Sequence, residues 1–192
     1  GARIWAVKVL DSEGRGRISN IIQGVDFVTE HAKEIEVANM SLGAQGLSRS
    51  LHKAVKNSVK AGVFYAVAAG NESTDIYGED RIYGTSDDVN PASYPEVATV
   101  SAMADTDGEA GGKGDVSERL ELDDTFATFS NFSTKVIGQH PVQSGGAAID
   151  LAAPGVEIFS CYKGKSYAKA SGTSMASPHI AGLAALYIAQ YG

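Results

Sequence analysis

The sequence is poor in cysteine, in long apolar runs and in basic residues, and each shortage excludes a class of protein. Its single cysteine, Cys161, excludes an internal disulfide and a cluster of thiolate metal ligands. No apolar stretch approaches the roughly 20 residues that a membrane-spanning helix needs. Lysine and arginine number 16 against 23 acidic residues, for a formal net charge of −7. Because such a chain offers no basic stripe for phosphates, we expect neither nucleic acid nor a membrane as a partner.

The sequence also lacks a starting methionine and a signal peptide. It opens on the apolar run GARIWAVKVL and closes on the helical pattern AGLAALYIAQYG. The first pattern starts almost directly inside a strand, and the second stops while still helical. We therefore expect a chain that is truncated at its N-terminus and at its C-terminus.

What the sequence does contain, in its first 70 residues, is a regular alternation of strand and helix patterns. Apolar runs at 4–10, 36–42 and 63–70 predict strands, and amphipathic patterns over 18–32 and 47–62 predict helices. Apolar strands joined by helices are typical of a parallel sheet covered on both faces. With 192 residues, 43% of them hydrophobic, we predict a single α/β domain over 1–192.

The remainder combines short strand patterns with two irregular acidic stretches. Strands are predicted within 94–103, 147–162 and 166–172, and a last helix from about residue 174 to 190. Acidic loops at about 72–91 and 105–124 are long enough to indicate a functional or metal-binding role. Cys161 falls in one of the apolar strand patterns and is predicted to be buried.

Two polar residues stand where catalytic groups would be expected in such a sheet. Ser174 starts the last helix, in GTSMASPH, and Asn71 follows the third strand, in AAGNES. A serine at a helix start is usually an N-cap, and an asparagine after a strand is usually a turn residue. The same pair would also supply a nucleophile beside free helix N–H groups and an amide donor for an oxyanion. Taken alone, the two residues leave both interpretations open.

Five motifs, in order along the chain, resemble those of the subtilisin-type serine peptidases: AVKVLDSEGRG, NMSLG, AAGNES, LAAPGVEI and GTSMASPHIAG. The resemblance covers nearly the whole chain outside the two acidic loops. It implies a three-layer αβα fold around a parallel sheet, and a secreted or cell-surface serine endopeptidase without an organic cofactor. It also implies that Ser174 is the nucleophile, and that Asn71 and the Ser174 backbone N–H form the oxyanion hole.

The resemblance further implies how a protein or peptide substrate would lie. Two chain edges would pair with the extended substrate, and a pocket would take the side chain before the scissile bond. Arg15, on the first edge, would favour an acidic residue upstream of the cut. The residues implied for substrate binding are Gly14, Arg15 and Gly16 on the first edge, Ser41, Leu42 and Gly43 on the second, and Ala68, Ala69 and Gly70 at the pocket.

One part of the family's machinery is missing from this sequence. Subtilisin-type enzymes carry their catalytic aspartate and histidine ahead of the AVKVL strand, where this chain begins. We do not expect the absent base to be replaced by any of the four histidines, which are His31, His52, His140 and His179. The chain alone is therefore expected to be inactive and to need the missing N-terminal segment of its own domain as a partner. An alternative is a non-catalytic derivative of the fold that binds peptides.

Calcium is the one cofactor that the sequence suggests. Asp105, Asp107 and Glu109 alternate in DTDGEAGG like half of a calcium loop, although a solvated acidic loop would have the same composition. The longer acidic loop could hold a second ion. The family resemblance adds a cation site formed by the main-chain carbonyl oxygens of Ala92, Tyr94 and Val97 and the carboxylate of Asp150.

Other enzyme classes fit less well. The stretch GRGRIS lacks the third glycine of a dinucleotide-binding loop, because Ser19 stands in its place. An α/β-hydrolase needs an acid and a histidine after its serine, and only 18 residues follow Ser174. A sedolisin-type peptidase, which shares the Gly-Thr-Ser step, uses an aspartate at the oxyanion position, where this chain has Asn71.

Overall fold

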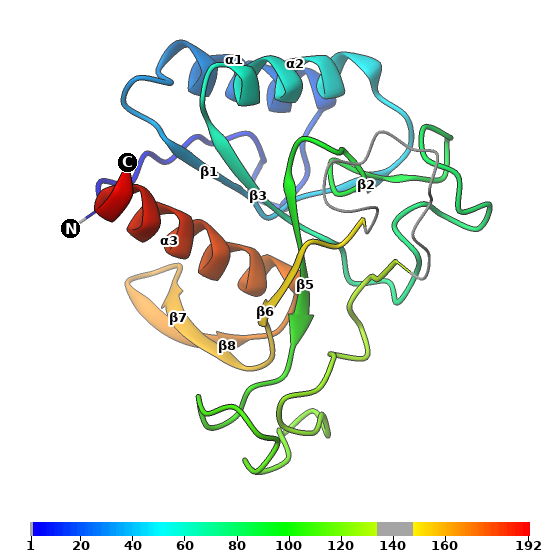
Figure 1. The fold of residues 1–192 in the computed structure, drawn as a ribbon, viewed down its shortest axis with the longest axis vertical. Coiled ribbons are helices and arrows are strands. Elements are labelled where there is room, and N and C mark those ends of the chain that lie inside the picture. The colour runs from blue at the N-terminus through cyan, green and yellow to red at the C-terminus, as the bar shows by residue number, and fades with distance from the viewer. Residues whose placement is uncertain (1, 134–147) are drawn as a thin grey trace.

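A four-stranded parallel sheet forms the centre of the molecule (Figure 1). The computed structural model describes residues 2–133 and 148–192. The strands run in the order β1-β3-β5-β6, so strands that follow one another along the chain in this sheet are also neighbours in space. Their bounds are β1 Val37–Met40, β3 Phe64–Ala68, β5 Ala98–Met103 and β6 Leu151–Pro154.

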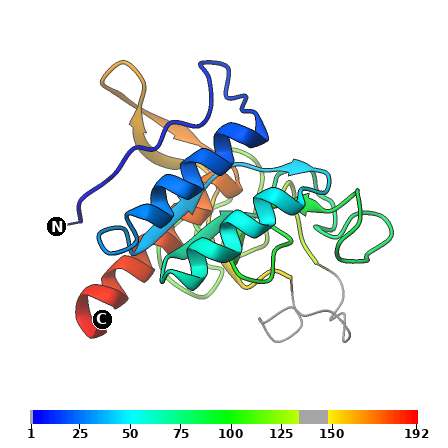
Figure 2. The same cartoon turned by 90° about the horizontal axis from the view of Figure 1, so that it is seen from above.

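Helices cover both faces of this sheet, which gives three layers. The helices α1 (Ile18–Glu30) and α2 (Arg49–Lys60) lie side by side on one face, and α3 (Thr173–Tyr191) crosses the other (Figures 1 and 2). The start of α2 is fixed by Ser48, whose side-chain oxygen accepts a hydrogen bond from the Leu51 N–H at 3.3 Å. The predicted parallel α/β fold of three layers is confirmed.

The two faces of the sheet carry side chains of different size. Toward α1 and α2 the core contains large groups such as Tyr65 of β3, packed in one cluster with Val55 of α2. Toward α3 it contains Ala66 of β3 and Ala102 of β5, packed with Ala176 of α3, and all three are fully buried. Because small side chains let a helix approach closely, the first turn of α3 comes near the carboxyl end of β3.

Two antiparallel pairs of strands lie outside the main sheet. The short strands β2 (Ala44–Gln45) and β4 (Val89–Asn90) pair beside the carboxyl end of the sheet. The strands β7 (Ile158–Tyr162) and β8 (Ser166–Ala170) form a hairpin that leads into α3. Cys161 lies on this hairpin and is exposed, so the prediction that it belongs to the core is wrong. Its strand is apolar, but four of the five residues in β7 are exposed on a ribbon that joins no larger sheet.

The predicted strand at 4–10 is also wrong, because this stretch forms no strand. Ile4 is 92% exposed and Trp5 is 40% exposed. The segment instead runs over α1, where a Cβ atom at Gly24 would lie 2.5 Å from the Cγ1 of Val9. Its apolar pattern signals burial, but β1 forms the edge of the sheet and does not pair with it. None of the helices in the described ranges is both long and apolar enough to span a membrane.

Candidate active site

Asn71 and Ser174 meet where the carboxyl end of β3 faces the start of α3. The side-chain oxygen Oδ1 of Asn71 accepts two hydrogen bonds from Thr173, one from its N–H at 2.7 Å and one from its Oγ1 at 3.0 Å. The Thr173 hydroxyl in turn accepts the Gly70 N–H at 3.0 Å. Because a backbone N–H can only donate, these contacts fix the orientation of the amide. The Nδ2 group is thereby kept as the donor end of Asn71.

Ser174 occupies the first turn of α3 and is partly buried. The Met175 N–H of this turn donates to the Gly172 carbonyl oxygen at 2.9 Å, and the helix dipole places its positive end here. The Ser174 carbonyl oxygen would normally accept the N–H of residue 178, but Pro178 has none. That carbonyl oxygen instead accepts a hydrogen bond from Ser41 Oγ at 2.9 Å. The loop after β1 is thus attached to the residue expected to act as the nucleophile.

A cavity of about 320 Å³ opens beside these two residues. Of the residues predicted to bind substrate, Leu42, Gly43, Ala68 and Gly70 line it. Ala69 does not line the cavity, because it is fully buried and donates its N–H to the Val100 carbonyl oxygen at 3.0 Å. The remaining lining residues are Ala44, Gln45, Asn71, Glu72, Thr74, Val89, Thr173 and Ser174. The predicted pocket residues, apart from Ala69 and Ser41, therefore surround one space next to the serine.

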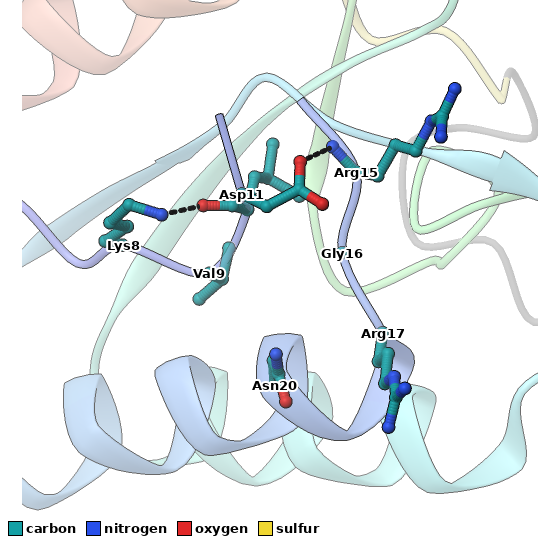
Figure 3. Close-up of a pocket in the computed structure, with 8 residues that line it drawn as sticks. Lys8, Val9, Asp11, Arg15, Gly16, Arg17 and Asn20 are labelled. Atoms are coloured by element: carbon teal, nitrogen blue, oxygen red, sulfur yellow. Dashed lines mark hydrogen bonds between the residues drawn. The ribbon is translucent and has the colours of Figure 1, made fainter. Parts of the chain in front are cut away.

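The predicted substrate-binding edge at 14–16 does not line the cavity beside Ser174. Asp11 closes this turn, because its Oδ1 accepts the N–H groups of Arg15 at 3.0 Å and Glu13 at 2.8 Å, and these bonds lower the pKa of the carboxyl. Arg15 and Gly16 line a second cavity of about 450 Å³ near the start of α1 (Figure 3). The Arg15 side chain is 80% exposed and pairs with Glu13. Among the described residues, this cavity shares no lining residue with the one beside Ser174.

The described histidines each contact a group other than Ser174. The Nδ1 atoms of His31 and His179 lie 2.8 Å from carbonyl oxygens of their own helices, those of Phe27 and Met175. His52 contacts Glu96 at 2.7 Å and stacks on Tyr94 with ring centroids 4.4 Å apart. His140 lies outside the described residues. That none of the four histidines acts as the base stays a prediction.

Three carboxylates gather in the second acidic loop. Oxygen atoms of Asp105, Asp107 and Asp123 lie within 4.8 Å of one another. Asp123 was not anticipated, because it stands far from the DTDGEAGG motif in sequence, yet it is 5% exposed and takes the place expected for Glu109. A hydrogen bond from the Thr106 N–H, followed by one from the Gly114 N–H, lowers the pKa of Asp123. Backbone N–H groups of the loop therefore hold these carboxylates in place.

Thr99 links two of the residues that the family resemblance implies for a cation site, Asp150 and Ala92. The Thr99 N–H donates to Asp150 Oδ2 at 2.8 Å, and the Thr99 hydroxyl donates to the Ala92 carbonyl oxygen at 2.6 Å. The Val97 N–H lies 3.4 Å from the Tyr94 carbonyl oxygen. A set of main-chain carbonyls with one carboxylate suits hard cations such as calcium. These residues fit the ion that the family resemblance implies.

In the first acidic loop, the aspartates turn inward. Asp88 is 1% exposed; its Oδ2 accepts the Gly84 N–H at 2.7 Å, and its Oδ1 is buried without a hydrogen-bond partner. Burial raises the pKa of Asp88 to about 6. Asp87 is half-buried, and its Oδ2 accepts the N–H groups of Glu79 and Asp80. Unlike the carboxylates of the second loop, those of the first do not converge on one point among the described residues.

Known proteins resemble this chain over its full length. The model of the subtilase family matches residues 1–192. Subtilisin-like protease 1 of Arthroderma gypseum is 37% identical over 196 residues, which cover 100% of this chain and 32% of that protein. Subtilisin-like serine protease Pen ch 13 of Penicillium rubens is 36% identical, with 100% and 39% covered.

Solved structures agree with these relatives. A cold adapted subtilisin-like serine proteinase superposes with a TM-score of 0.71 at 33% identity, covering 96% of this chain and 52% of that one. The S41 psychrophilic protease gives a TM-score of 0.75 at 30% identity, with 97% and 54% covered. This chain thus spans about a third of the length of the curated relatives and about half of the solved chains. On the evidence of the family model, the relatives and the shared fold, the chain belongs to the subtilase family.

Proposed function

We propose that this chain provides the nucleophile and the oxyanion hole of a serine endopeptidase. The observation that supports this most directly is the pair of hydrogen bonds from Thr173 to Asn71 Oδ1. Thr173 directly precedes Ser174, so these bonds keep the Asn71 amide beside the serine, at the positive end of the helix dipole.

In the proposed reaction, Ser174 Oγ attacks the carbonyl carbon of the scissile peptide while a general base takes its proton. The C=O π bond opens, and the resulting oxyanion is stabilised by Asn71 Nδ2 and the Ser174 N–H. The C–N bond then breaks, the amine leaves with a proton from the conjugate acid of the base, and an acyl-enzyme remains on Ser174. Water releases the acid product by the same steps.

Substrate binding is proposed at the cavity beside Ser174. Its volume of about 320 Å³ suits one side chain, and Gly43 and Gly70 line it without side chains of their own. The Ser41–Gly43 edge would pair with an extended peptide. The edge at 14–16 would form the other side of the peptide cleft, and Arg15 is exposed there for an acidic residue upstream of the cut.

We propose that the general base comes from a segment outside this chain. Three of the four histidines are held by other contacts, and the chain spans only part of its relatives. In subtilisin, a member of the same family, removal of the triad histidine lowers turnover by about 10⁶-fold. The chain alone is therefore expected to show no measurable peptidase activity. A non-catalytic peptide-binding derivative is the alternative, supported by the same cavity and the same lack of a local base.

A fluorophosphonate probe with an intact-mass readout tests the proposal. We expect no labelling of the chain alone, labelling of the full-length protein that contains it, and loss of that labelling in Ser174→Ala. Asn71→Ala should lower kcat of the full-length protein by about 10²–10³-fold with little change in KM. An unlabelled but folded full-length protein that still binds peptides would establish the non-catalytic alternative.

We also propose calcium as a cofactor, held by Asp150 and the carbonyl oxygens of Ala92, Tyr94 and Val97. Its role there would be to stabilise the loop between β4 and β5. Calcium should raise the thermal unfolding midpoint of the protein, and Asp150→Asn should abolish most of that increase. The carboxylates of the second acidic loop are a further candidate for the same ion, tested by Asp107→Asn.

Secretion or display at the cell surface stays a prediction, which detection of the protein in culture supernatant or on intact cells would test.

A further inference from the structure

Asn131 lies beneath the loop that carries Asn71, and it is fully buried. The residues of that loop, Asn71 to Thr74, are themselves exposed. An exposed loop has few packing contacts of its own, so its position depends on what holds it from below. The buried amide of Asn131 is that support.

Every hydrogen-bonding position of the Asn131 amide is used on this loop. Its Nδ2 donates to the Ala69 carbonyl oxygen at 3.0 Å and to Glu72 Oε2 at 2.9 Å. Its Oδ1 accepts the N–H groups of Glu72 and Thr74, each at 3.0 Å, and lies 3.3 Å from the Thr74 hydroxyl. An amide has two donors and one acceptor oxygen, and all are engaged between residues 69 and 74.

Glu72 carries this support to Asn71 itself. The same Oε2 atom that accepts from Asn131 also accepts the Asn71 N–H at 2.8 Å. A charged oxygen that accepts two N–H groups makes stronger hydrogen bonds than a neutral acceptor. The backbone of Asn71 is thus linked to the buried amide through one carboxylate.

Asn131 is in turn attached to the central sheet. The neighbouring Ser130, also fully buried, accepts the Ala102 N–H of β5 at 3.0 Å and donates to the Asn131 carbonyl oxygen at 3.0 Å. The Asn131 N–H donates to the Gly70 carbonyl oxygen at 2.9 Å. A Cβ atom at Gly70 would lie 2.3 Å from Asn131 Nδ2, so the two residues already touch. This close contact leaves no space between Asn131 and the backbone of the loop.

We propose that Asn131 is a positioning residue for the oxyanion hole: it fixes the loop at 69–74 so that Asn71 Nδ2 points at the developing oxyanion. The inference rests on the proposed peptidase function. Thr173 holds the side chain of Asn71, and Asn131 holds its backbone. Because displacement of a catalytic group by about 1 Å can cost 10²-fold in rate, loss of the buried amide should act on turnover.

Asn131→Asp in the full-length protein is the sharpest test. The shape of the side chain and its acceptor oxygen are kept, but the group that faced Glu72 Oε2 and the Ala69 carbonyl oxygen becomes an acceptor. We expect kcat to fall about 10–100-fold while KM changes by less than about twofold. A residue that only stabilises the fold would lower the unfolding midpoint without this separation of kcat from KM.

The matched control is Asn57→Asp on the exposed surface of α2, which should leave kcat and KM unchanged. If Asn131→Asp does not fold, Asn131→Ala, which introduces no charge, carries the same expectation for kcat. A folded Asn131 variant with wild-type kcat, or with a change confined to KM, overturns the inference. An inactive wild-type protein instead overturns the proposed function, and the inference with it.

Discussion

At the scale of single residues, a missing donor shapes the first turns of α3. Pro178 cannot donate to the Ser174 carbonyl oxygen, and the hydroxyl of Ser41 takes its place at 2.9 Å. A helix would lose stability at such a proline unless the freed carbonyl found another partner. The substitute comes from the loop after β1, so the irregularity in α3 ties two parts of the site together.

Ser41→Ala should therefore lower the free energy of unfolding by about 1 kcal/mol, because it leaves the partly buried Ser174 carbonyl oxygen unpaired. Chemical denaturation of the purified protein measures this. In a Pro178→Ala background the backbone N–H of residue 178 is restored, so the same Ser41 change should cost clearly less. Equal costs in both backgrounds would show that the Ser41 hydroxyl acts through some other contact.

The buried carboxyl of Asp88 predicts a dependence of stability on pH. Its pKa of about 6 in the folded protein lies above the ordinary aspartate value of 3.8, because burial disfavours the charged form. Between these two values the folded state keeps a proton that the unfolded state has lost, so stability decreases as the pH rises and stays lower above pH 6. Asp88→Asn should remove this penalty and stabilise the protein at pH 7 by up to about 3 kcal/mol.

Urea unfolding of wild type and Asp88→Asn at pH 4 and pH 7, with and without a chelator, measures the difference. The two proteins should be similar at pH 4 and should diverge at pH 7. A variant that is less stable than wild type at pH 7, in the absence of chelator only, would indicate that the charge of Asp88 has a cation as its partner.

At the scale of elements, α3 has two unlike sides. Its inner side carries small residues against the sheet, such as the fully buried Ala176. Its outer side is also apolar in sequence, but the structure exposes it: Leu183 is 60% exposed and Leu186 is 71% exposed. A helix that is apolar all round is typical of one buried on all sides. The inner contact is therefore what holds α3 on the sheet in this structure.

A larger side chain on the inner side of α3 should lower the free energy of unfolding, whereas a smaller side chain on the outer side should not. Ala176→Leu should destabilise the protein by about 1–3 kcal/mol, because the space against Ala66 and Ala102 is filled. Leu183→Ala, in the same helix, should change the free energy of unfolding by no more than about 0.5 kcal/mol. Thermal unfolding at low protein concentration compares them, and a large cost at Leu183 would mean that its side chain is covered in solution.

At the scale of the whole molecule, large apolar side chains are exposed on α3 and on the hairpin of β7 and β8. Beyond Leu183, the outer side of α3 exposes Leu186, Tyr187 and Tyr191, each more than 60% accessible. The hairpin adds Phe159, which is stacked on Tyr167. Contiguous apolar patches of this kind tend to be covered by another surface.

We therefore expect this chain, when isolated, to associate with itself. Sedimentation velocity should show a weight-average mass that rises with concentration, and the double variant Leu186→Lys with Tyr187→Lys should reduce that rise. Asn57→Lys adds charge on α2 and serves as the control. A monomer at all concentrations would show that the outer side of α3 does not mediate self-association.

The sequence predicted the strands inside the central sheet better than the segments around it. The strands around 37–40 and 64–68 and the helices α1 and α2 follow from their apolar patterns, because side chains pack on both faces of the sheet. The stretch 4–10 has the same composition but no strand partner, which no local pattern could show. Asp123 and Asn131 were missed for a similar reason: each acts on a segment remote in sequence, and nothing in the local pattern marks the partner.

The acidic loops at 72–91 and 105–124 lie between Asn71 and Ser174 in sequence, but neither belongs to the central sheet. The loop at 105–124 is tied to itself, since Asp124 Oδ2 accepts the N–H groups of Gly111 and Gly112. Its tip, around exposed Glu109, is therefore a suitable insertion point for a fluorescent or affinity domain. A reporter domain inserted there would leave the distance between Ser174 and the Asn71 amide unchanged.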